Sequence, residues 1–147
     1  MQVIGRLSRA SRLVERAIKE ELVTHGIEPW EFDVLATLLR SGPPHVLNAG
    51  TLSTAAMVSS AALTNRIDQL VERGLVDRVV DPDHRRRVLI SLTAPGLTLV
   101  NQLVEHHLAN ERRLLAELPA SDRDLLAVLL RRLLVSLGDR ADATSER

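Results

Sequence analysis

Three consecutive arginines, Arg85, Arg86 and Arg87, are the residues of this sequence most clearly arranged to bind an anion. Adjacent like charges repel one another, so the cluster is costly unless a negatively charged partner meets it. The DNA backbone supplies such charge, and a narrow minor groove attracts inserted arginine side chains. A solvated turn explains an isolated arginine triplet equally well, so the flanking sequence has to decide between the two interpretations.

Small polar residues precede the arginine cluster at positions where one helix would present them near its N-terminus: Ser59, Ser60, Thr64 and Asn65. Such side chains contact base edges and phosphates in protein–DNA complexes. A polar helix beside a basic turn suits a major groove and the adjacent minor groove. These four residues and the three arginines therefore predict a surface that binds double-stranded DNA.

The helix that would carry the polar residues has clear sequence signals. Leu63, Ile67 and Leu70 recur at helical spacing and form one apolar face. Ser59 precedes them at the position of an N-cap, where its hydroxyl satisfies a free backbone N–H. Gly74 follows the last apolar position, where a left-handed residue ends many helices. The pattern predicts a helix that begins after Ser59 and ends before Gly74.

A β-hairpin is predicted to follow this helix. Residues 75–80 and 88–92 are short runs rich in Val, Leu and Ile, which favour strands. Between them, residues 81–87 contain the turn formers Asp81, Pro82 and Asp83 and then the arginine cluster. The three arginines are therefore expected on or beside the tip of the hairpin.

Together these segments resemble the winged helix-turn-helix of the MarR family of transcriptional regulators. The matching residues are 52–56 for the first helix, Val58 and Ser59 for the turn, Thr64, Asn65 and Arg66 for the recognition helix, Arg73, Gly74, Leu75 and Val76 for the helix exit, and 81–86, Leu92 and Thr93 for the wing. The resemblance extends into the flanking helices and so covers nearly the whole chain.

The resemblance implies a mainly α fold with a small β-wing. A single domain over residues 1–147 would contain a winged helix-turn-helix at 28–93, with dimerisation helices at 1–25 and 94–138 on either side. The implied function is a sequence-specific DNA-binding transcriptional regulator. Repression is the usual mode of the family, so a repressor is expected.

One position of the wing departs from the family. The family usually has an aspartate two residues before the wing arginine that matches Arg86, and His84 stands there in this sequence. Asp81 and Asp83 are both alternatives for orienting Arg86, and the sequence does not distinguish them. His84 itself would meet a phosphate more strongly when protonated.

The terminal helices predict a homodimer. Residues 2–25 form a helix with one apolar stripe, whereas its four arginines, Arg6, Arg9, Arg12 and Arg16, face either solvent or an anion. A helix over 94–118 ends before Pro119, and Ser121 with Asp124 resembles a capping box that opens a last helix. That last helix is apolar almost all round, which indicates burial by a second chain. Residues 139–147 are expected to be a frayed tail.

Shorter elements are predicted between the first helix and the recognition helix. A helix begins near Pro29, continues to Leu39, and is followed by a break at residues 41–44. Residues 45–47 are expected to form a short strand of the wing sheet. Asn48 is placed to cap a supporting helix that ends at Met57.

Within the family, the sequence resembles the branch that includes urate-responsive regulators. In that branch a carboxylate on the second helix and two arginines bind or support an anionic aromatic ligand, and the matching residues here are Asp33, Arg66 and Arg78. Trp30 is core or a stacking surface for such a ligand. The branch also uses a tryptophan on an N-terminal extension that has no counterpart here, so an aromatic or phenolic anion is expected rather than urate specifically.

A simpler interpretation of two of these residues stays open. Asp33 lies on a mostly apolar helix, where an unpaired carboxylate is costly to bury. A salt bridge from Asp33 to Arg66 would tie the second helix to the recognition helix without any ligand.

Several classes of function are disfavoured. The sequence has no nucleophile elbow, glycine-rich phosphate loop or HExxH helix, so we predict that it is not an enzyme, with no catalytic residue and no cofactor. It has no cysteine, which excludes disulfides and thiolate zinc sites and favours a cytoplasmic protein. No apolar run is long enough to span a membrane. Aromatic residues are only 1% of the chain, so the core has to be aliphatic.

Two other functions remain as alternatives. A metal-responsive regulator would use scattered histidines: His25, His45, His84, His106 and His107. His106 and His107 are adjacent and would point about 100° apart on a helix, so no metal site is predicted. A winged helix that only mediates protein interaction is the second alternative, and the arginine cluster argues against it. Salt dependence separates the cases, because DNA binding weakens steeply with salt.

Overall fold

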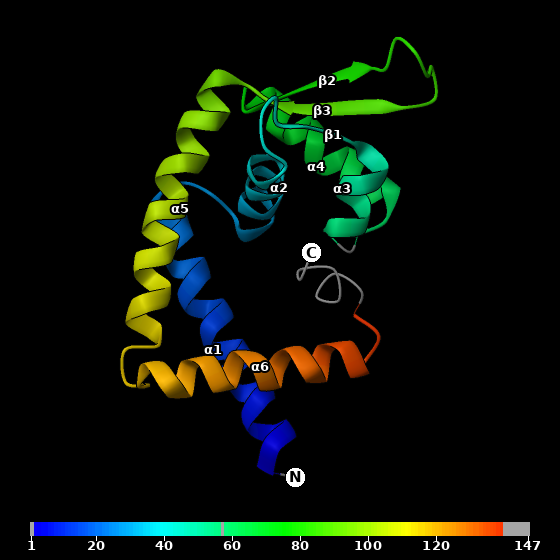
Figure 1. Cartoon of the computed structure of the whole chain (residues 1–147). Helices are drawn as coiled ribbons and strands as arrows, with labels where there is room; N and C mark the ends of the chain where they lie inside the picture. The colour runs from blue at the N-terminus through cyan, green and yellow to red at the C-terminus, as the bar shows by residue number, and fades with distance from the viewer. Residues whose placement is uncertain (1, 57, 140–147) are drawn as a thin grey trace. The chain divides into compact units, whose positions relative to one another are not determined.

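The computed structural model describes residues 2–56 and 58–139. These residues belong to two compact units, 1–110 and 111–147. The elements, in chain order, are α1 Gln2–Thr24, α2 Pro29–Arg40, β1 Val46–Asn48, α3 Ala49–Ala55, α4 Ser60–Glu72, β2 Val76–Val80, β3 Val88–Leu92, α5 Ala94–Leu114 and α6 Ala120–Ser136. The prediction of a mainly helical chain with a small β-wing is confirmed (Figure 1).

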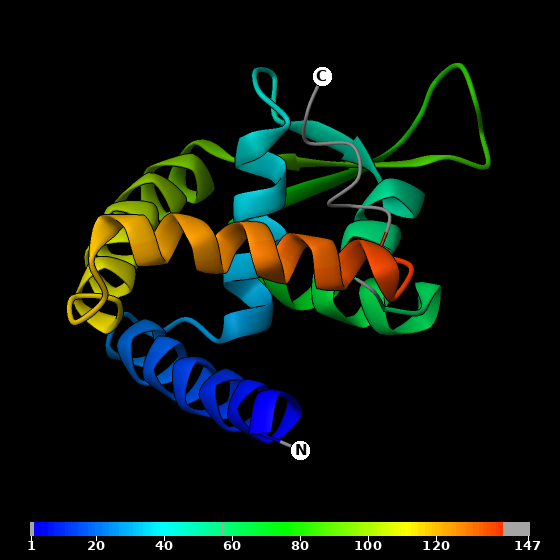
Figure 2. The same cartoon turned by 60° about the horizontal axis from the view of Figure 1, so that its bottom comes forward.

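The wing is a hairpin of β2 and β3, and β1 completes a three-stranded antiparallel sheet in the order β1-β3-β2. The hairpin register runs from Val76 opposite Leu92 to Val80 opposite Val88. The turn at 81–87 therefore lies at the far end of the hairpin, which extends beyond α3 and α4 of the same unit in Figures 1 and 2. The predicted strand at residues 45–47 is confirmed as β1, which begins at Val46.

Both ends of α4 form as their residues predict. The Ser59 hydroxyl accepts a hydrogen bond from the Ala62 backbone N–H at 3.2 Å. Gly74 has φ +69°, and the N–H of Leu75 donates to the Leu70 carbonyl at 3.0 Å. Because an L-residue adopts this positive φ only with strain, glycine fits the position best.

The core of the first unit is aliphatic, as the composition requires. Its large, fully buried side chains come from helices α1 to α5 and from the sheet: Leu22, Val34, Leu35, Leu38, Leu52, Ile67, Leu70, Val76, Ile90, Val100 and Leu103. Leu63 is also buried, so the apolar face of α4 points inward and its opposite face is left for solvent or a partner.

A close contact fixes the start of α5 beside the end of α4. The Thr93 hydroxyl accepts from the Gly96 N–H at 3.0 Å and donates to the Gly74 carbonyl at 2.6 Å. A Cβ on Gly96 would lie 2.0 Å from the Leu75 carbonyl oxygen, so no larger residue fits without a shift. The Thr93 side chain therefore caps the start of α5 and ties it to the end of α4.

Two predicted helix ends are wrong. The helix predicted over 94–118 ends at Leu114, because tighter bonds follow: Ala116 N–H donates to Arg113 O at 3.3 Å, and Leu118 N–H to Leu115 O at 3.0 Å. The last helix begins at Ala120 and not after Ser121, because the Pro119 carbonyl already accepts from the N–H groups of residues 122 and 123.

Some predicted features lie outside the described residues. Met57, the predicted last residue of the supporting helix, is one of them, and α3 ends at Ala55. The predicted frayed tail lies outside too, except for Asp139.

Apolar side chains are exposed on both helices of the predicted dimer contact. Near the start of α1, Val3 is 73% exposed and Ile4 is 63% exposed. No residue of α6 is buried, and Leu125 is 58% exposed. The dimer stays a prediction, because a single chain does not test it.

None of the helices in the described ranges is both long enough and apolar enough for a membrane crossing.

Candidate nucleic-acid interface

The wing turn is shaped by its own backbone and by Asp81. The Asp81 N–H donates to the Arg87 carbonyl at 2.8 Å, and the Arg87 N–H donates to the His84 carbonyl at 2.7 Å. The Asp81 carboxylate accepts from the Asp83 N–H at 2.9 Å. These bonds close the turn without using the arginine side chains, which stay available for a partner.

All three arginines of the cluster are exposed. Among residues 2–56 and 58–139, Arg85, Arg86 and Arg87 form no salt bridge. Neither Asp81 nor Asp83 pairs with Arg86 there, so neither of the two acids orients it in the free protein. Three unpaired guanidinium groups give the wing a local positive charge, although the chain as a whole has a formal net charge of zero.

An open cleft of about 410 Å³ lies between the wing and the start of α3. The wing contributes His84, Arg86, Arg87 and Val88, and the α3 side contributes residues 48–50. The position where the family has an aspartate thus faces the same cleft as Arg86. The cleft therefore contains the His84 imidazole, which can donate a hydrogen bond, instead of an acid.

The exposed face of α4 carries the other predicted DNA contacts. Ser59, Ser60, Thr64 and Asn65 are all exposed. The Ser59 oxygen accepts its capping bond, so its hydroxyl hydrogen remains free to donate to a partner. The Thr64 hydroxyl donates to the Ser60 carbonyl at 2.9 Å, so its oxygen remains free to accept. The face therefore offers both donors and acceptors to base edges.

The residues predicted to bind an effector are partly brought together. The Arg66 guanidinium carbon lies 5.7 Å from the centre of the Trp30 ring, within cation–π range. Asp33 lies on the same helix as Trp30, near enough to Arg66 and His107 for these residues to act electrostatically on its carboxyl group. Arg78 is engaged elsewhere: it forms an ion pair with Asp68 of α4.

Asp33 is electrostatically unusual. Desolvation by its packed surroundings raises the pKa of its carboxyl group above the ordinary value, and Arg40, Arg66 and His107 oppose this rise. Within the described ranges, Asp33 forms no salt bridge with Arg66. The alternative of a purely structural Asp33–Arg66 pair is therefore wrong, because Arg66 lies over Trp30 instead.

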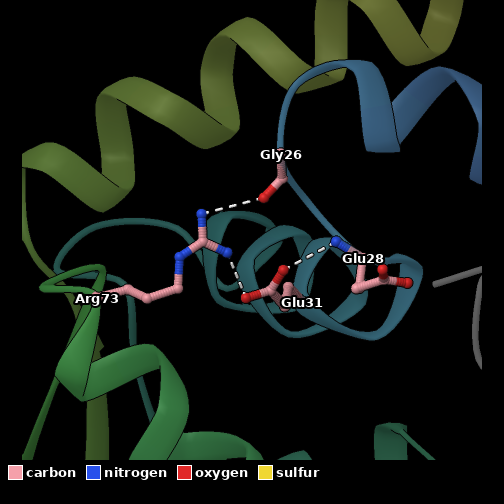
Figure 3. Close-up of polar contacts among 4 residues, drawn as sticks. All are labelled: Gly26, Glu28, Glu31 and Arg73. Carbon is pink, nitrogen blue, oxygen red and sulfur yellow. Dashed lines mark hydrogen bonds and ion pairs between the residues drawn. The ribbon is translucent and has the colours of Figure 1, made fainter.

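A partly buried ion pair that the sequence does not reveal holds α4 to α2 (Figure 3). Arg73, the C-cap of α4, donates to the Glu31 carboxylate at 2.5 Å and to the Gly26 carbonyl at 3.1 Å. The other Glu31 oxygen accepts from the Glu28 N–H at 2.8 Å and completes a capping box at the start of α2. Glu31 is only 5% exposed. Three segments therefore meet at one carboxylate and one guanidinium.

Each member of this pair has a local role that explains its presence in the sequence. Glu31 lies in the first turn of α2, where an acid favours the helix dipole, and Arg73 directly follows the last residue of α4. An acid at the third position of a helix and an arginine at the end of another are common signals, and their separation of 42 residues gives no hint of contact. Only the placement of α4 across the start of α2 joins them.

The raised pKa of Asp33 predicts a pH-dependent stability. Because the folded state binds this proton more tightly than the unfolded chain does, stability falls as pH rises through the window between the two pKa values. Asp33→Asn cannot ionise, so it should be more stable than the wild type at pH 7. The difference should shrink toward about pH 3, below the pKa of the unfolded chain, where the Asp33 carboxyl group is largely neutral in both states. Urea unfolding at both pH values measures this, and a less stable Asn variant at pH 7 would contradict it.

Known proteins with similar sequences are transcriptional regulators. A sequence profile of the MarR family matches residues 25–87. The transcriptional regulator PecS of Dickeya dadantii is 38% identical over 132 residues, covering 90% of this chain and 80% of that protein.

Solved structures agree with the sequence comparison. AbsC, a MarR-family regulator from Streptomyces coelicolor, aligns with a TM-score of 0.82 at 25% identity over 97% of this chain and 95% of that one. A mutant of Escherichia coli MarR complexed with operator DNA aligns with a TM-score of 0.80 at 27% identity, over 89% and 93% of the two chains.

Proposed function

The chain belongs to the MarR family of transcriptional regulators, and on that premise we propose that it binds operator DNA as a homodimer, represses transcription, and is released by a small aromatic or phenolic anion. Its relatives are regulators and not enzymes. The place of action would be the cytoplasm, where the operator is.

The observation that carries this proposal is the unpaired arginine cluster at the wing tip beside an exposed polar face of α4. Ser59, Ser60, Thr64 and Asn65 would contact the major groove, and Arg85, Arg86 and Arg87 the minor groove and its phosphates. The similarity to a regulator solved with operator DNA supports DNA as the partner.

The proposed dimer follows from the exposed apolar residues of α1 and α6. Residues 1–25 and 94–138 would supply the dimer contact, and residues 28–93 the DNA-binding part. Two copies carry two recognition helices, so the operator should be a pseudo-palindrome with half-sites about one helical turn apart.

The proposed effector site is centred on Trp30, Asp33 and Arg66. The indole offers a flat surface, and Arg66 already lies over it, so an aromatic anion would meet stacking and charge in one place. Arg78 completes the proposed set if it leaves Asp68. Because Arg66 is on α4, a ligand that draws it also displaces the helix that contacts DNA.

The test is binding to the DNA upstream of the protein's own gene and of its divergent neighbour, measured by fluorescence anisotropy at two salt concentrations. We expect dimeric binding that weakens steeply with salt. Salicylate and related phenols should lower the affinity in the wild type but not in Asp33→Asn.

Two results would separate the alternatives. Monomeric binding to non-palindromic DNA would contradict the dimer. An unchanged ligand response in Asp33→Asn would contradict the proposed role of Asp33 in effector binding. If no DNA fragment bound in a salt-sensitive way, a winged helix that only mediates protein interaction would be favoured instead.

A further inference from the structure

Two histidines and a glutamate from distant parts of the sequence meet beside the end of α1. Glu21 lies on α1, His25 directly follows that helix, and His106 lies on α5. One ligand atom from each residue lies within 4.8 Å of the others. His25 Nε2 is 3.1 Å from Glu21 Oε1, and the rings of His25 and His106 have centroids 4.5 Å apart. The cluster is separate from the wing and from the residues proposed to bind the effector.

The donor set of this cluster is one that a transition metal prefers. Two imidazole nitrogens and a carboxylate oxygen form a common protein set for Zn²⁺, with a fourth position left for water or a small ligand. Such a set is much less suited to Mg²⁺, which prefers oxygen ligands and keeps most of its water. The spacing of Glu21 and His25, four residues apart, brings both side chains to one side of the end of α1.

One oxygen of Glu21 lacks a partner that a metal would supply. Glu21 Oε2 is buried and makes no hydrogen bond in the part of the chain that the structure describes. A buried, unsatisfied carboxylate oxygen costs free energy, so its persistence calls for a cation or donor that the chain itself does not provide. The histidine rings stay exposed, which leaves a path from solvent to the site.

The two helices that carry the ligands are held together close to the cluster. Asn110 lies one turn further along α5 than His106, is 5% exposed, and donates from Nδ2 to the Ala17 carbonyl of α1 at 3.4 Å. The neighbouring residue His107 points elsewhere and lies against Phe32, with ring centroids 4.9 Å apart. Of these two histidines, His106 is therefore the one directed to the α1 side. A small adjustment of the Glu21, His25 and His106 side chains would bring three ligands to one metal.

We propose that Glu21, His25 and His106 form a binding site for a divalent transition metal of the zinc type, which cross-links the end of α1 to α5. The site departs from the expectation of no metal ligand, because the sequence pattern alone does not bring His106 to α1. Gly26, the residue after His25, accepts the hydrogen bond from Arg73, so the metal would also steady the loop that receives the end of α4.

The experiment uses untagged, full-length protein freed of metal with a chelator. Titration calorimetry with ZnCl₂ should show one Zn²⁺ per chain, and thermal unfolding should shift upward with Zn²⁺ but not with MgCl₂. Co²⁺ should give the visible absorption of a tetrahedral site. His106→Ala and Glu21→Gln should each weaken zinc binding at least about tenfold. His84→Ala, which removes an exposed histidine of the wing, is the matched control and should bind like the wild type.

Each outcome decides the proposal. Loss of binding in both site variants, with circular dichroism spectra like that of the wild type, supports it. No stoichiometric binding to the wild type, or equal binding by wild type and His106→Ala, overturns it. Because none of these measurements involves DNA, the metal site and the operator-binding proposal can fail independently.

Discussion

Replacing Arg85, Arg86 and Arg87 together by alanine should weaken operator binding by about 100- to 1000-fold at low salt. The three guanidinium groups are exposed and have no acidic partner among the described residues, so their removal does not disturb an internal ion pair. What is lost is attraction to phosphates and to a minor groove. Arg86→Ala alone should account for a substantial share, about tenfold or more.

Salt dependence identifies the physical cause of this loss. Each phosphate contact removed from a dimer should reduce the slope of log affinity against log salt by about 0.9. Removing Arg6, Arg9 and Arg12 instead changes the charge by the same amount on α1, and this control also tests whether those arginines touch DNA. If both triple variants lost affinity and slope equally, long-range charge rather than wing contact would explain the binding.

Replacing Arg73 by alanine should lower the free energy of unfolding by about 2–3 kcal/mol. The substitution leaves the Glu31 carboxylate, whose side chain is 6% exposed, without its cation and with only the Glu28 N–H bond. The range is below that of a fully buried pair because the Arg73 side chain is itself 40% exposed. Urea unfolding at one fixed protein concentration measures the change, since the stability of a dimer depends on concentration.

Two further variants show whether the buried charge is the cause. Adding Glu31→Gln to Arg73→Ala removes the unpaired charge and should restore at least half of the lost stability. Arg78→Ala breaks the pair with Asp68, in which both side chains are over 40% exposed, and should cost under about 1 kcal/mol. If Arg73→Ala were no more destabilising than Arg78→Ala, the partly buried Arg73–Glu31 pair would contribute no more to stability than an exposed pair.

Local signals were sufficient to predict most of the helices and strands and the exposure of the residues proposed to bind DNA. Ser59 and Gly74 specify the two ends of α4 through caps made within a few residues, and both caps form as expected. The turn between β2 and β3 likewise depends on neighbouring residues. The exposed arginines follow directly from it, because a tight turn at a hairpin tip has no room to bury long side chains.

Contacts between distant segments could not be predicted in this way. Arg73 and Glu31 each have a local role that explains their presence, so nothing in the sequence asks for a partner far away. Asp33 and Arg66 show the converse: opposite charges predict a pair, but an indole competes for the arginine, and packing decides in favour of Trp30.

The ion pairs of α4 with other elements are unevenly distributed along the helix, so its two ends are held differently. The ion pairs that it forms within the described ranges lie at its C-terminal end, where Asp68 pairs with Arg78 and the C-cap Arg73 pairs with Glu31. Its other end, with Ser60 and Thr64, bonds within its own turn. If α4 tilted by about 5° about a pivot near Arg73, its far end, roughly 20 Å away, would move by about 1.7 Å. Arg66 lies near the middle of α4, so a displacement there by the proposed ligand would be roughly doubled at the end proposed to contact bases. A shift of that size would separate hydrogen-bonded atoms.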